Sequence, residues 1–323
     1  MAKTAIISEL GDANQFSIVE QDIPPPGPGE VQIRNRAIGL NFIDIYQRRG
    51  LYPVSLPAVL GKEAAGEVIA IGQGVTGITE GQRVASLVQG GGYAQIMNAP
   101  ASRTAILPES VSFDIAAGAL LKGLTASMLI HDIFPLAAGH TVLVTAASGG
   151  VGGILCQWAL HLGANIIAVV GSAEKADIAR QNSIKNVIIR TQTNDLAGSV
   201  RDLTNGDGVD VVYDSLGAET FYASLDSLRP RGLMVTYGNA TGPVPAIAPL
   251  ELAKRGSLIL TRPILFDFAT PDRFASMAEK LFTVLANGVV KPSIHKEYQL
   301  DSVSEAHQFL ESGKSQGTII LHP

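Results

Sequence analysis

The chain has 323 residues and a formal net charge of −5; 46% of its residues are hydrophobic and 16% are charged. This composition supports a large folded core and argues against intrinsic disorder, and the acidic balance argues against nucleic acid or an anionic membrane as the main partner. A single cysteine, Cys156, excludes an intramolecular disulfide and suits a reducing compartment. We see no signal peptide and no apolar stretch approaching the ~18–20 residues of a spanning helix. We therefore expect a soluble cytoplasmic protein with no membrane partner.

The first 110 residues or so read as strands separated by turn residues, including the run PPPGPGE. This texture predicts an antiparallel, partly barrel-like β domain. The expected strands lie within residues 4–10, 16–23, 30–39, 63–72, 82–88 and 91–98.

The texture changes after Ser112, where residues 112–134 have the length and spacing of a helix. Short apolar strands then alternate with helical segments, which is typical of a parallel sheet covered on both faces. The expected strands lie within residues 141–147, 165–171, 186–190, 209–216, 233–239 and 257–263. The expected helices lie within residues 172–182, with Ser172 as N-cap, 194–205 and 219–228.

The tail returns to mixed structure. Residues 270–288 predict a helix with Thr270 as cap and Pro271 in its first turn. Ser302 and Glu305 have the spacing of a capping box, and residues 317–323 read as a strand that rejoins the first β domain. We therefore expect one domain from residues 1–122 and 266–323 and a second from residues 123–265.

The sequence ASGGVG places Ala147, Gly149 and Gly152 at the three positions of the pattern G-x-G-x-x-G, with alanine first. The pattern follows an apolar strand and opens a helix, which is the context that indicates dinucleotide binding. Gly149 would let the backbone approach a pyrophosphate, and Gly152 would let helix and strand pack closely. The alternative is a glycine-rich turn without a ligand.

The end of the second strand favours NADPH over NADH. An NAD site places Asp or Glu there to hold the ribose 2′-hydroxyl, but this chain has Val170 and Gly171. Ser172, Lys175 and Arg190 are candidates to bind a 2′-phosphate, although Lys175 and Arg190 also fit solvated surface charge.

Several segments together resemble the medium-chain dehydrogenase/reductase superfamily, and most closely its quinone oxidoreductase, or zeta-crystallin-like, branch. They are AIGLNFIDIYQRRGLYP, LGKEAAGEV, LLKGLTA, AASGGVG, VVYDSLG and RPRGLMVTYGN, in that order along the chain. The resemblance implies a Rossmann-type doubly wound parallel sheet domain plus a GroES-like, mainly antiparallel β catalytic domain.

The superfamily also contains zinc alcohol dehydrogenases, so metal binding needs a direct test. At the positions of their Cys and His ligands this chain has Asn41 and Lys62, which are poor zinc ligands, and Glu63 alone makes no site. A structural zinc lobe needs four cysteines, and Cys156 is expected to be a small core residue. We expect no metal and read the chain as a zinc-independent reductase.

Without metal, the chemistry would be hydride transfer to an acceptor that is already electron-poor, a quinone or a conjugated carbonyl compound. By resemblance, the substrate would lie in the cleft between the domains. The expected catalytic residues are Asn41, as a donor to a substrate or nicotinamide oxygen, Tyr46, as a possible proton relay, Tyr52 and Thr125. Alternatively, Asn41 is a helix cap and the two tyrosines are half-buried packing.

The resemblance also implies the cofactor contacts. They are Phe42, Ile43, Asp44, Tyr46, Met128, Gly149, Gly150, Val151, Gly152, Gly171, Ser172, Lys175, Arg190, Ser215, Gly238, Asn239, Arg262, Pro263, Ile264 and Lys314. The chain departs from the branch at Arg190, where Tyr is common, and at Lys314, near which the branch often has Arg. An aromatic residue common after KGLT is also absent, since Ser127 and Met128 stand there.

The preferred function is an NADPH-dependent quinone oxidoreductase acting on a small-molecule quinone. The alternative is an enone or 2-haloacrylate-type double-bond reductase on the same scaffold. A crystallin-like structural or RNA-binding role gains little support from an acidic chain without a basic–aromatic stripe. By resemblance we expect a homodimer joined by edge strands of the parallel sheets, near residues 233–239 and 257–263.

Overall fold

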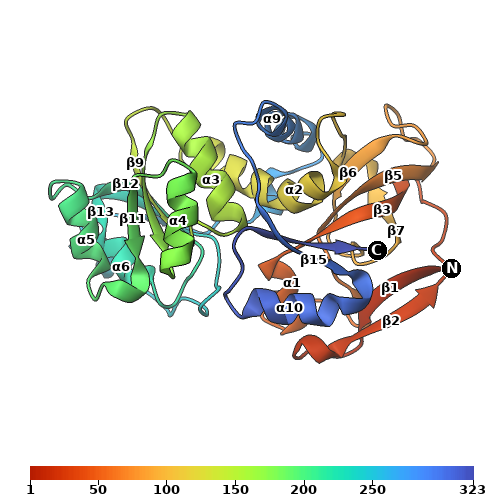
Figure 1. Ribbon diagram of the computed structural model, residues 1–323, viewed down its shortest axis with the longest axis horizontal. Coiled ribbons are helices and arrows are strands. Elements are labelled where there is room, and N and C mark those ends of the chain that lie inside the picture. Colours follow the sequence, from red (N-terminus) through yellow and green to blue (C-terminus); the bar gives the residue numbers. More distant parts are fainter. The chain divides into compact units, whose positions relative to one another are not determined.

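A computed structural model describes all 323 residues, which form two compact units (Figure 1). The first, called the antiparallel unit here, comprises Met1–Leu124, Ala269–Gly288 and Pro292–Pro323. The second, called the parallel unit, comprises Thr125–Phe268 and Val289–Lys291.

The parallel unit is built on a six-stranded sheet in the order β11-β10-β9-β12-β13-β14, with every neighbouring pair parallel. Its strands are β9 (Thr141–Thr145), β10 (Asn165–Val170), β11 (Asn186–Ile189), β12 (Val209–Asp214), β13 (Leu228–Thr236) and β14 (Ile259–Thr261). Its helices are α3 (Gly150–His161), α4 (Ala173–Gln181), α5 (Leu196–Leu203), α6 (Phe221–Asp226), α7 (Leu250–Lys254) and α8 (Leu265–Phe268), with a 3₁₀ turn η4 (Arg190–Gln192). The strand order reverses direction between β9 and β12, and open α/β sheets bind ligands at the carboxyl ends of the strands at such a point.

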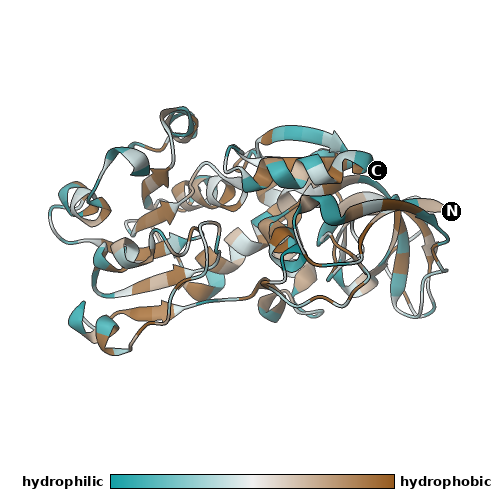
Figure 2. Ribbon diagram, turned by 90° about the horizontal axis from the view of Figure 1, so that it is seen from below, coloured by the Kyte–Doolittle hydropathy of each residue, from teal (hydrophilic) through white to brown (hydrophobic).

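Helices α3 and α4 pack on β9, β10 and β11 and lie side by side, and α6 packs on β12 and β13 (Figure 1). The central strands are apolar along their length, as a sheet covered on both faces requires, and Figure 2 shows these stretches in brown. This confirms the predicted Rossmann-type doubly wound domain.

The antiparallel unit contains a seven-stranded and a three-stranded sheet. Its strands are β1 (Ala2–Ile7), β2 (Phe16–Gln21), β3 (Glu30–Leu40), β4 (Ala58–Val59), β5 (Glu63–Ile71), β6 (Arg83–Leu87), β7 (Ile96–Pro100), β8 (Thr104–Ile106), β15 (Ile294–Gln299) and β16 (Thr318–His322). Its helices are α1 (Phe42–Arg48), α2 (Phe113–Ser127), which runs on into the parallel unit, α9 (Phe274–Ala286) and α10 (Val303–Glu311), with 3₁₀ turns η1 (Ala13–Gln15), η2 (Ala101–Arg103) and η5 (Leu300–Ser302).

The strand predicted near residue 320 is β16, and it enters the interior of the seven-stranded sheet. It pairs antiparallel with β3, with Ile320 opposite Gly39, and parallel with β15 on its other side. A mainly antiparallel β unit was predicted, and this sheet confirms it.

Two predicted helix starts differ from the structure. The α9 helix begins at Phe274 rather than at Pro271, and its N-cap is Arg273 rather than Thr270. The Thr270 hydroxyl bonds the nearby Asp272 carboxylate and lowers its pKa. Ser302 is the N-cap of α10, but its side chain makes no cap hydrogen bond, so the predicted capping box does not form.

The helix predicted over residues 112–134 changes type part-way. The α2 helix ends at Ser127, and a π-helix, η3 (Met128–Ile133), continues it. The continuous segment Phe113–Ile133 is long and apolar enough to cross a membrane, which corrects the expectation that no such stretch exists. Because 78% of an apolar 18-residue window within this segment is buried inside the protein, the segment has the character of a core helix.

Candidate active site

The carboxyl ends of the central parallel strands are tied together by backbone and side-chain contacts. The backbone N–H of Ser215, just after β12, donates to the Thr145 hydroxyl at the end of β9 over 2.9 Å. A Cβ on Gly238 would lie 2.4 Å from the carbonyl oxygen of Ser215, so only glycine lets the chain after β13 pass here. Arg262, after β14, donates to the Thr236 hydroxyl at 3.0 Å and to the Gly238 carbonyl at 3.3 Å. Ser215, Gly238 and Arg262 therefore share one edge of the sheet, with Asn239 directly after Gly238.

The glycine turn lies at the same edge, between β9 and α3. Ala146 has a φ of 49°, and Gly149 is the N-cap of α3. A Cβ on Gly152 would lie 2.4 Å from the Ala146 carbonyl oxygen, which confirms that Gly152 allows close packing of helix against turn. The first N–H groups of the helix, from Gly150 and Val151 onward, have no acceptor within the helix and carry the positive end of its dipole. This geometry suits an anionic pyrophosphate.

The end of β10 presents the candidate 2′-phosphate groups. Ser172 caps α4 as predicted, accepting the backbone N–H of Lys175 at 3.4 Å. A Cβ on Gly171 would meet nothing within 4 Å, and burial lowers the pKa of Lys175. One carboxylate is present nearby: Glu174, in the first turn of α4, is hydrogen-bonded by Ser172.

Arg190 follows β11, beside the end of β10, and its side chain already forms an ion pair. The Thr191 hydroxyl donates to the carbonyl of Gly171 at 3.2 Å, which joins the end of β11 to the end of β10. The Arg190 guanidinium forms an ion pair with Glu219, so a phosphate would compete with that carboxylate for it.

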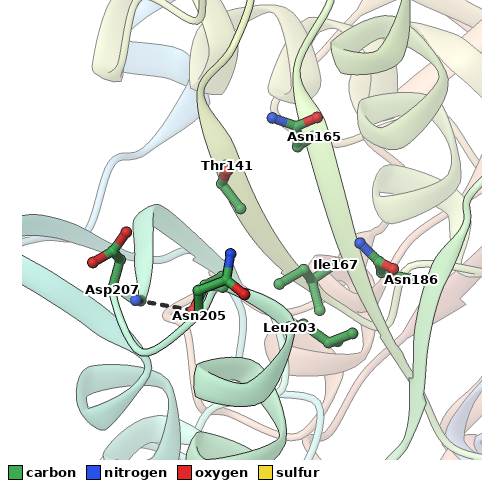
Figure 3. Close-up of a pocket in the computed structure, with 9 residues that line it drawn as sticks. Thr141, Asn165, Ile167, Asn186, Leu203, Asn205 and Asp207 are labelled. Carbon is green, nitrogen blue, oxygen red and sulfur yellow. Dashed lines mark hydrogen bonds between the residues drawn. The ribbon is translucent and has the colours of Figure 1, made fainter.

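A hollow of about 330 Å³ lies at the opposite edge of the same sheet, at the amino ends of β9, β10 and β11 (Figure 3). Thr141, Asn165 and Asn186 line it from the strands, and Asn205 and Asp207 line it from the loop after α5. It contains none of the predicted site residues and is separate from the glycine turn.

In the antiparallel unit, α1 carries an aromatic cluster. The ring centroids of Phe42 and Tyr46 are 6.1 Å apart, and those of Tyr46 and Tyr52 are 5.4 Å apart in an edge-to-face arrangement. The backbone N–H of Tyr52 donates to the carbonyl of Tyr46 at 3.2 Å, which fixes the loop after α1 against the helix. All three rings, like Ile43 between them in sequence, are half-buried.

Asn41, the N-cap of α1, is oriented by a buried carboxylate. Its amide nitrogen donates to Oε1 of Glu63 at 2.9 Å and to the carbonyl of Gly39 at 3.4 Å. Lys122 donates to the same Oε1 at 2.9 Å, and the backbone N–H of Leu121 donates to Oε2 at 2.5 Å. Both amide hydrogens of Asn41 thus have acceptors within the protein.

Asp44 also differs from expectation. It was predicted as a cofactor contact, but it has no exposed surface. Its carboxylate accepts the backbone N–H of Asn41 and the hydroxyl of Tyr93, both at 2.9 Å, and that hydroxyl also lies 3.0 Å from Nε2 of His307. Burial raises the pKa of Asp44 to about 6. Asp44 therefore holds the start of α1 onto the core instead of facing a ligand.

Comparison with known proteins identifies the family to which the chain belongs. Residues 27–109 match the alcohol dehydrogenase GroES-like domain, and residues 150–281 match the zinc-binding dehydrogenase family. The chain is 41% identical to a quinone oxidoreductase of Pseudomonas aeruginosa and 40% identical to a 2-haloacrylate reductase of a Burkholderia species, covering all of this chain and at least 99% of each relative. The chain belongs to the quinone oxidoreductase branch of the medium-chain dehydrogenase/reductase superfamily. A crystal structure of Escherichia coli quinone oxidoreductase complexed with NADPH is 40% identical over the full length of both chains, with a TM-score of 0.97.

The remaining predicted residues of this oxidoreductase come from several separate segments of the sequence. Thr125 is half-buried near the end of α2, and Met128 is buried at the start of the π-helix. Pro263 and Ile264 follow Arg262 before α8, and Lys314 is exposed on the loop after α10 in the antiparallel unit. Cys156 is buried in α3, as predicted for a core residue.

Sequence reasoning missed the residues that hold these groups in place. The sequence marks Lys122 only as part of the segment LLKGLTA and Glu63 only as a lone carboxylate. Asp214, at the end of β12, is fully buried and accepts the N–H groups of Leu216 and Gly217 and the hydroxyls of Thr220 and Ser224. A carboxylate at the end of an otherwise apolar strand is the signal that could have identified Asp214.

Proposed function

We propose that the chain is an NADPH-dependent quinone oxidoreductase that works without zinc. The observation that carries the proposal is the full-length identity of 41–42% to named quinone oxidoreductases. The glycine turn at the carboxyl edge of the sheet and the absence of a carboxylate at Val170 and Gly171 support the choice of cofactor.

The residues present fit the cofactor. The N-terminus of α3 from Gly149 to Gly152 would hold the pyrophosphate, and the open space beside Gly171, with Ser172 and Lys175, would take the 2′-phosphate. Ser215, Gly238, Asn239 and the segment from Arg262 to Ile264 would line the nicotinamide side. When bound, NADPH supplies a hydride for a conjugated acceptor.

The proposed catalytic residues are Tyr46, Tyr52 and Asn41 in the antiparallel unit and Thr125 at the start of the parallel unit. Tyr46 stands at the centre of the aromatic cluster, where it would offer a flat apolar surface and one hydroxyl to a quinone ring. Zinc independence is supported by the chemistry of the donor set: Asn41 and Lys62 are poor ligands, and the ammonium of Lys122 already neutralises Glu63.

The second candidate is a 2-haloacrylate or enone reductase. It is favoured by the full-length identity of 40% to a 2-haloacrylate reductase. Both functions need hydride delivery to a conjugated acceptor, so the two differ in the shape of the pocket and not in the core chemistry.

Steady-state kinetics separate the two. We expect a higher kcat/KM for 1,4-benzoquinone and 9,10-phenanthrenequinone than for 2-chloroacrylate or a small enone, with NADPH preferred over NADH and full activity after treatment with a zinc chelator. Turnover confined to the acrylate would select the second candidate. No oxidation of NADPH with any acceptor would overturn both.

We also propose that the protein is a cytoplasmic homodimer joined through β14. This strand is an edge of the parallel sheet and pairs only with β13. Ile259, on this strand, is 57% exposed, and Leu250 and Ile264, which precede and follow the strand in the sequence, are 62% and 60% exposed. An uncovered edge with apolar side chains favours pairing with a second copy.

A further inference from the structure

The starting observation is the buried ion pair between Glu63 and Lys122. The Glu63 side chain is 0% exposed and that of Lys122 is 7% exposed, with Nζ 2.9 Å from Oε1. Strand β3 passes close by: a Cβ on Gly39 would lie 2.3 Å from Oε1 of Glu63 and 2.1 Å from the carbonyl of Ala117 on α2. Glu63 thus joins β5, the N-cap of α1 and the middle of α2.

The pair fixes which way the Asn41 amide faces. Its two hydrogen-bond neighbours, the Glu63 carboxylate and the Gly39 carbonyl, can only accept, so the NH₂ group must point to them. Lys122 contributes because its ammonium group is the second donor to Oε1 and balances the buried negative charge of Glu63. The group of Asn41 that is left for other partners is Oδ1.

Oδ1 is an acceptor with two lone pairs, so it can accept a backbone N–H from the first turn of α1 and also accept a hydrogen bond from a ligand. A carbonyl oxygen of a quinone has no hydrogen to donate to Oδ1. A hydroxyl or an amide N–H can donate one, and the nicotinamide half of a dinucleotide carries both kinds of donor, whereas the hydroquinone product carries hydroxyls.

We propose that Glu63 and Lys122 are positioning residues that make Asn41 a hydrogen-bond acceptor for an O–H or N–H group of the bound cofactor or product. This inference rests on the proposed function. It reverses the polarity that the sequence suggested for Asn41, and it gives the buried ion pair a role that a core of apolar residues could not perform.

A carboxylate–amide exchange tests the polarity. In Asn41→Asp, two carboxylates face each other. In Glu63→Gln, an amide nitrogen in the place of Oε1 would face the Asn41 amide and Lys122, which are both donors, unless the Asn41 amide rotates by 180°. In the double variant N41D/E63Q, the amide introduced at position 63 donates to the carboxylate introduced at position 41. The other oxygen of that carboxylate remains an acceptor, and the net charge of the cluster is the same as in the wild type. We expect each single variant to weaken NADPH binding by about tenfold or more, and the double variant to return within about threefold of wild type.

The measurements are the Kd for NADPH without acceptor, the urea midpoint of the unliganded protein, and kcat/KM for 1,4-benzoquinone. Recovery of the Kd in the double variant assigns the donor to the cofactor; recovery of kcat/KM alone assigns it to the reduced product. Recovery of neither, in a folded double variant from an active wild type, overturns the inference. An inactive wild type would instead contradict the proposed function.

Asn35→Asp is the matched control. Asn35 is also buried on β3, and its amide nitrogen also donates to two acceptors, the carbonyls of Gly92 and Ala94. This change should lower the urea midpoint but leave the NADPH Kd of the folded protein unchanged. If Asn35→Asp weakens NADPH binding as strongly as Asn41→Asp does, the effect is general destabilisation and the inference fails. If Glu63→Gln does not fold, the comparison of Asn41→Asp with the double variant still decides.

Discussion

Gly152 stands where the first turn of α3 passes closest to the turn after β9. An alanine there would place its Cβ 2.4 Å from the Ala146 carbonyl oxygen, which is backbone and cannot move aside freely. We expect Gly152→Ala to lower the free energy of unfolding by about 1–3 kcal/mol through overpacking, measured by urea denaturation.

The neighbouring glycine provides the control. A Cβ on Gly153 would meet its nearest atom at 3.8 Å, an ordinary contact, and it lies in the same helix. Gly153→Ala should be neutral or stabilise by up to about 1 kcal/mol, because alanine favours helix. If both variants lost the same free energy of unfolding, the close contact with the Ala146 carbonyl would not be the reason for glycine at position 152.

Glu219 pairs with Arg190, which the sequence suggests as a further ligand of the 2′-phosphate. Its carboxylate would also repel a phosphate. We expect Glu219→Gln to tighten NADPH binding about two- to fivefold with no change for NADH, measured by titration calorimetry. The control is Glu251→Gln, which breaks a comparable pair with Arg255 in the same unit. Equal effects on the two cofactors would remove Arg190 from the site.

Asp44 makes a prediction about pH. Burial raises its pKa from 3.8 to about 6, so the folded protein binds this proton more tightly than the unfolded chain does. Stability contributed at this position is therefore highest below the unfolded pKa and falls as pH rises to about 6. Asn does not ionise, so this loss is absent in Asp44→Asn. The free energy of unfolding of the variant, relative to that of the wild type, should therefore increase by on the order of 3 kcal/mol between pH 4 and pH 7.

Urea denaturation at several pH values checks this. The comparison with wild type is needed because His307, whose pKa burial lowers well below its usual value, adds stability as pH rises through the same range. Exposed Asp177→Asn should show a small and constant difference. A constant difference for Asp44→Asn would contradict the raised pKa.

At the scale of the element, the turn between β12 and α6 depends on one carboxylate. Thr220 donates to Oδ2 of Asp214 at 2.6 Å inside the core. Thr220→Val keeps the shape and removes this bond, and we expect it to cost about 1.5–3 kcal/mol by urea denaturation, since the acceptor is a buried carboxylate. Exposed Thr283→Val should change stability by no more than about 0.5 kcal/mol. A similarly small effect at Thr220 would contradict the role of Asp214.

The elements themselves were largely predictable because their signals are local. Periodicity located the six parallel strands and their helices, and glycine spacing located the turn before α3. Helix ends were less predictable: Thr270 has the right type for a cap, but the helix begins four residues later, at Phe274, with Arg273 as its N-cap. The change to a π-helix at Met128 likewise had no sequence signal that we recognised.

The candidate site was predictable only where the chain itself forms it. The glycine turn and Ser172 are local, and they lie as expected. The orientation of Asn41 depends on Glu63 and Lys122, which are 22 and 81 residues away in sequence and meet it only through the fold. Long-range contacts of this kind explain why the sequence did not reveal the partners of the Asn41 amide and the Asp44 carboxylate.

At the scale of the whole molecule, the proposed dimer gives a test in solution. Lysine in place of Ile259 would put a charge at the start of β14, the edge strand, at a side chain that is exposed. We expect Ile259→Lys to convert a dimer into a monomer in light scattering coupled to gel filtration. Leu10→Lys, at a residue 47% exposed in the antiparallel unit, should leave the mass unchanged. A monomeric wild type would contradict the proposal.

The pairing of β16 with β3 has a consequence for biosynthesis. The parallel unit is built from one continuous stretch up to Phe268 and a short later segment, whereas the sheet that begins with β3 must wait for residues 318–322 to fill its interior. A growing chain leaves the ribosome in sequence order, so most of the parallel unit can form while the antiparallel unit, which contains the first residue, is still incomplete. Until translation reaches β16, both flanks of its future place expose unpaired strand edges, and this is the stage at which a nascent chain most needs a chaperone.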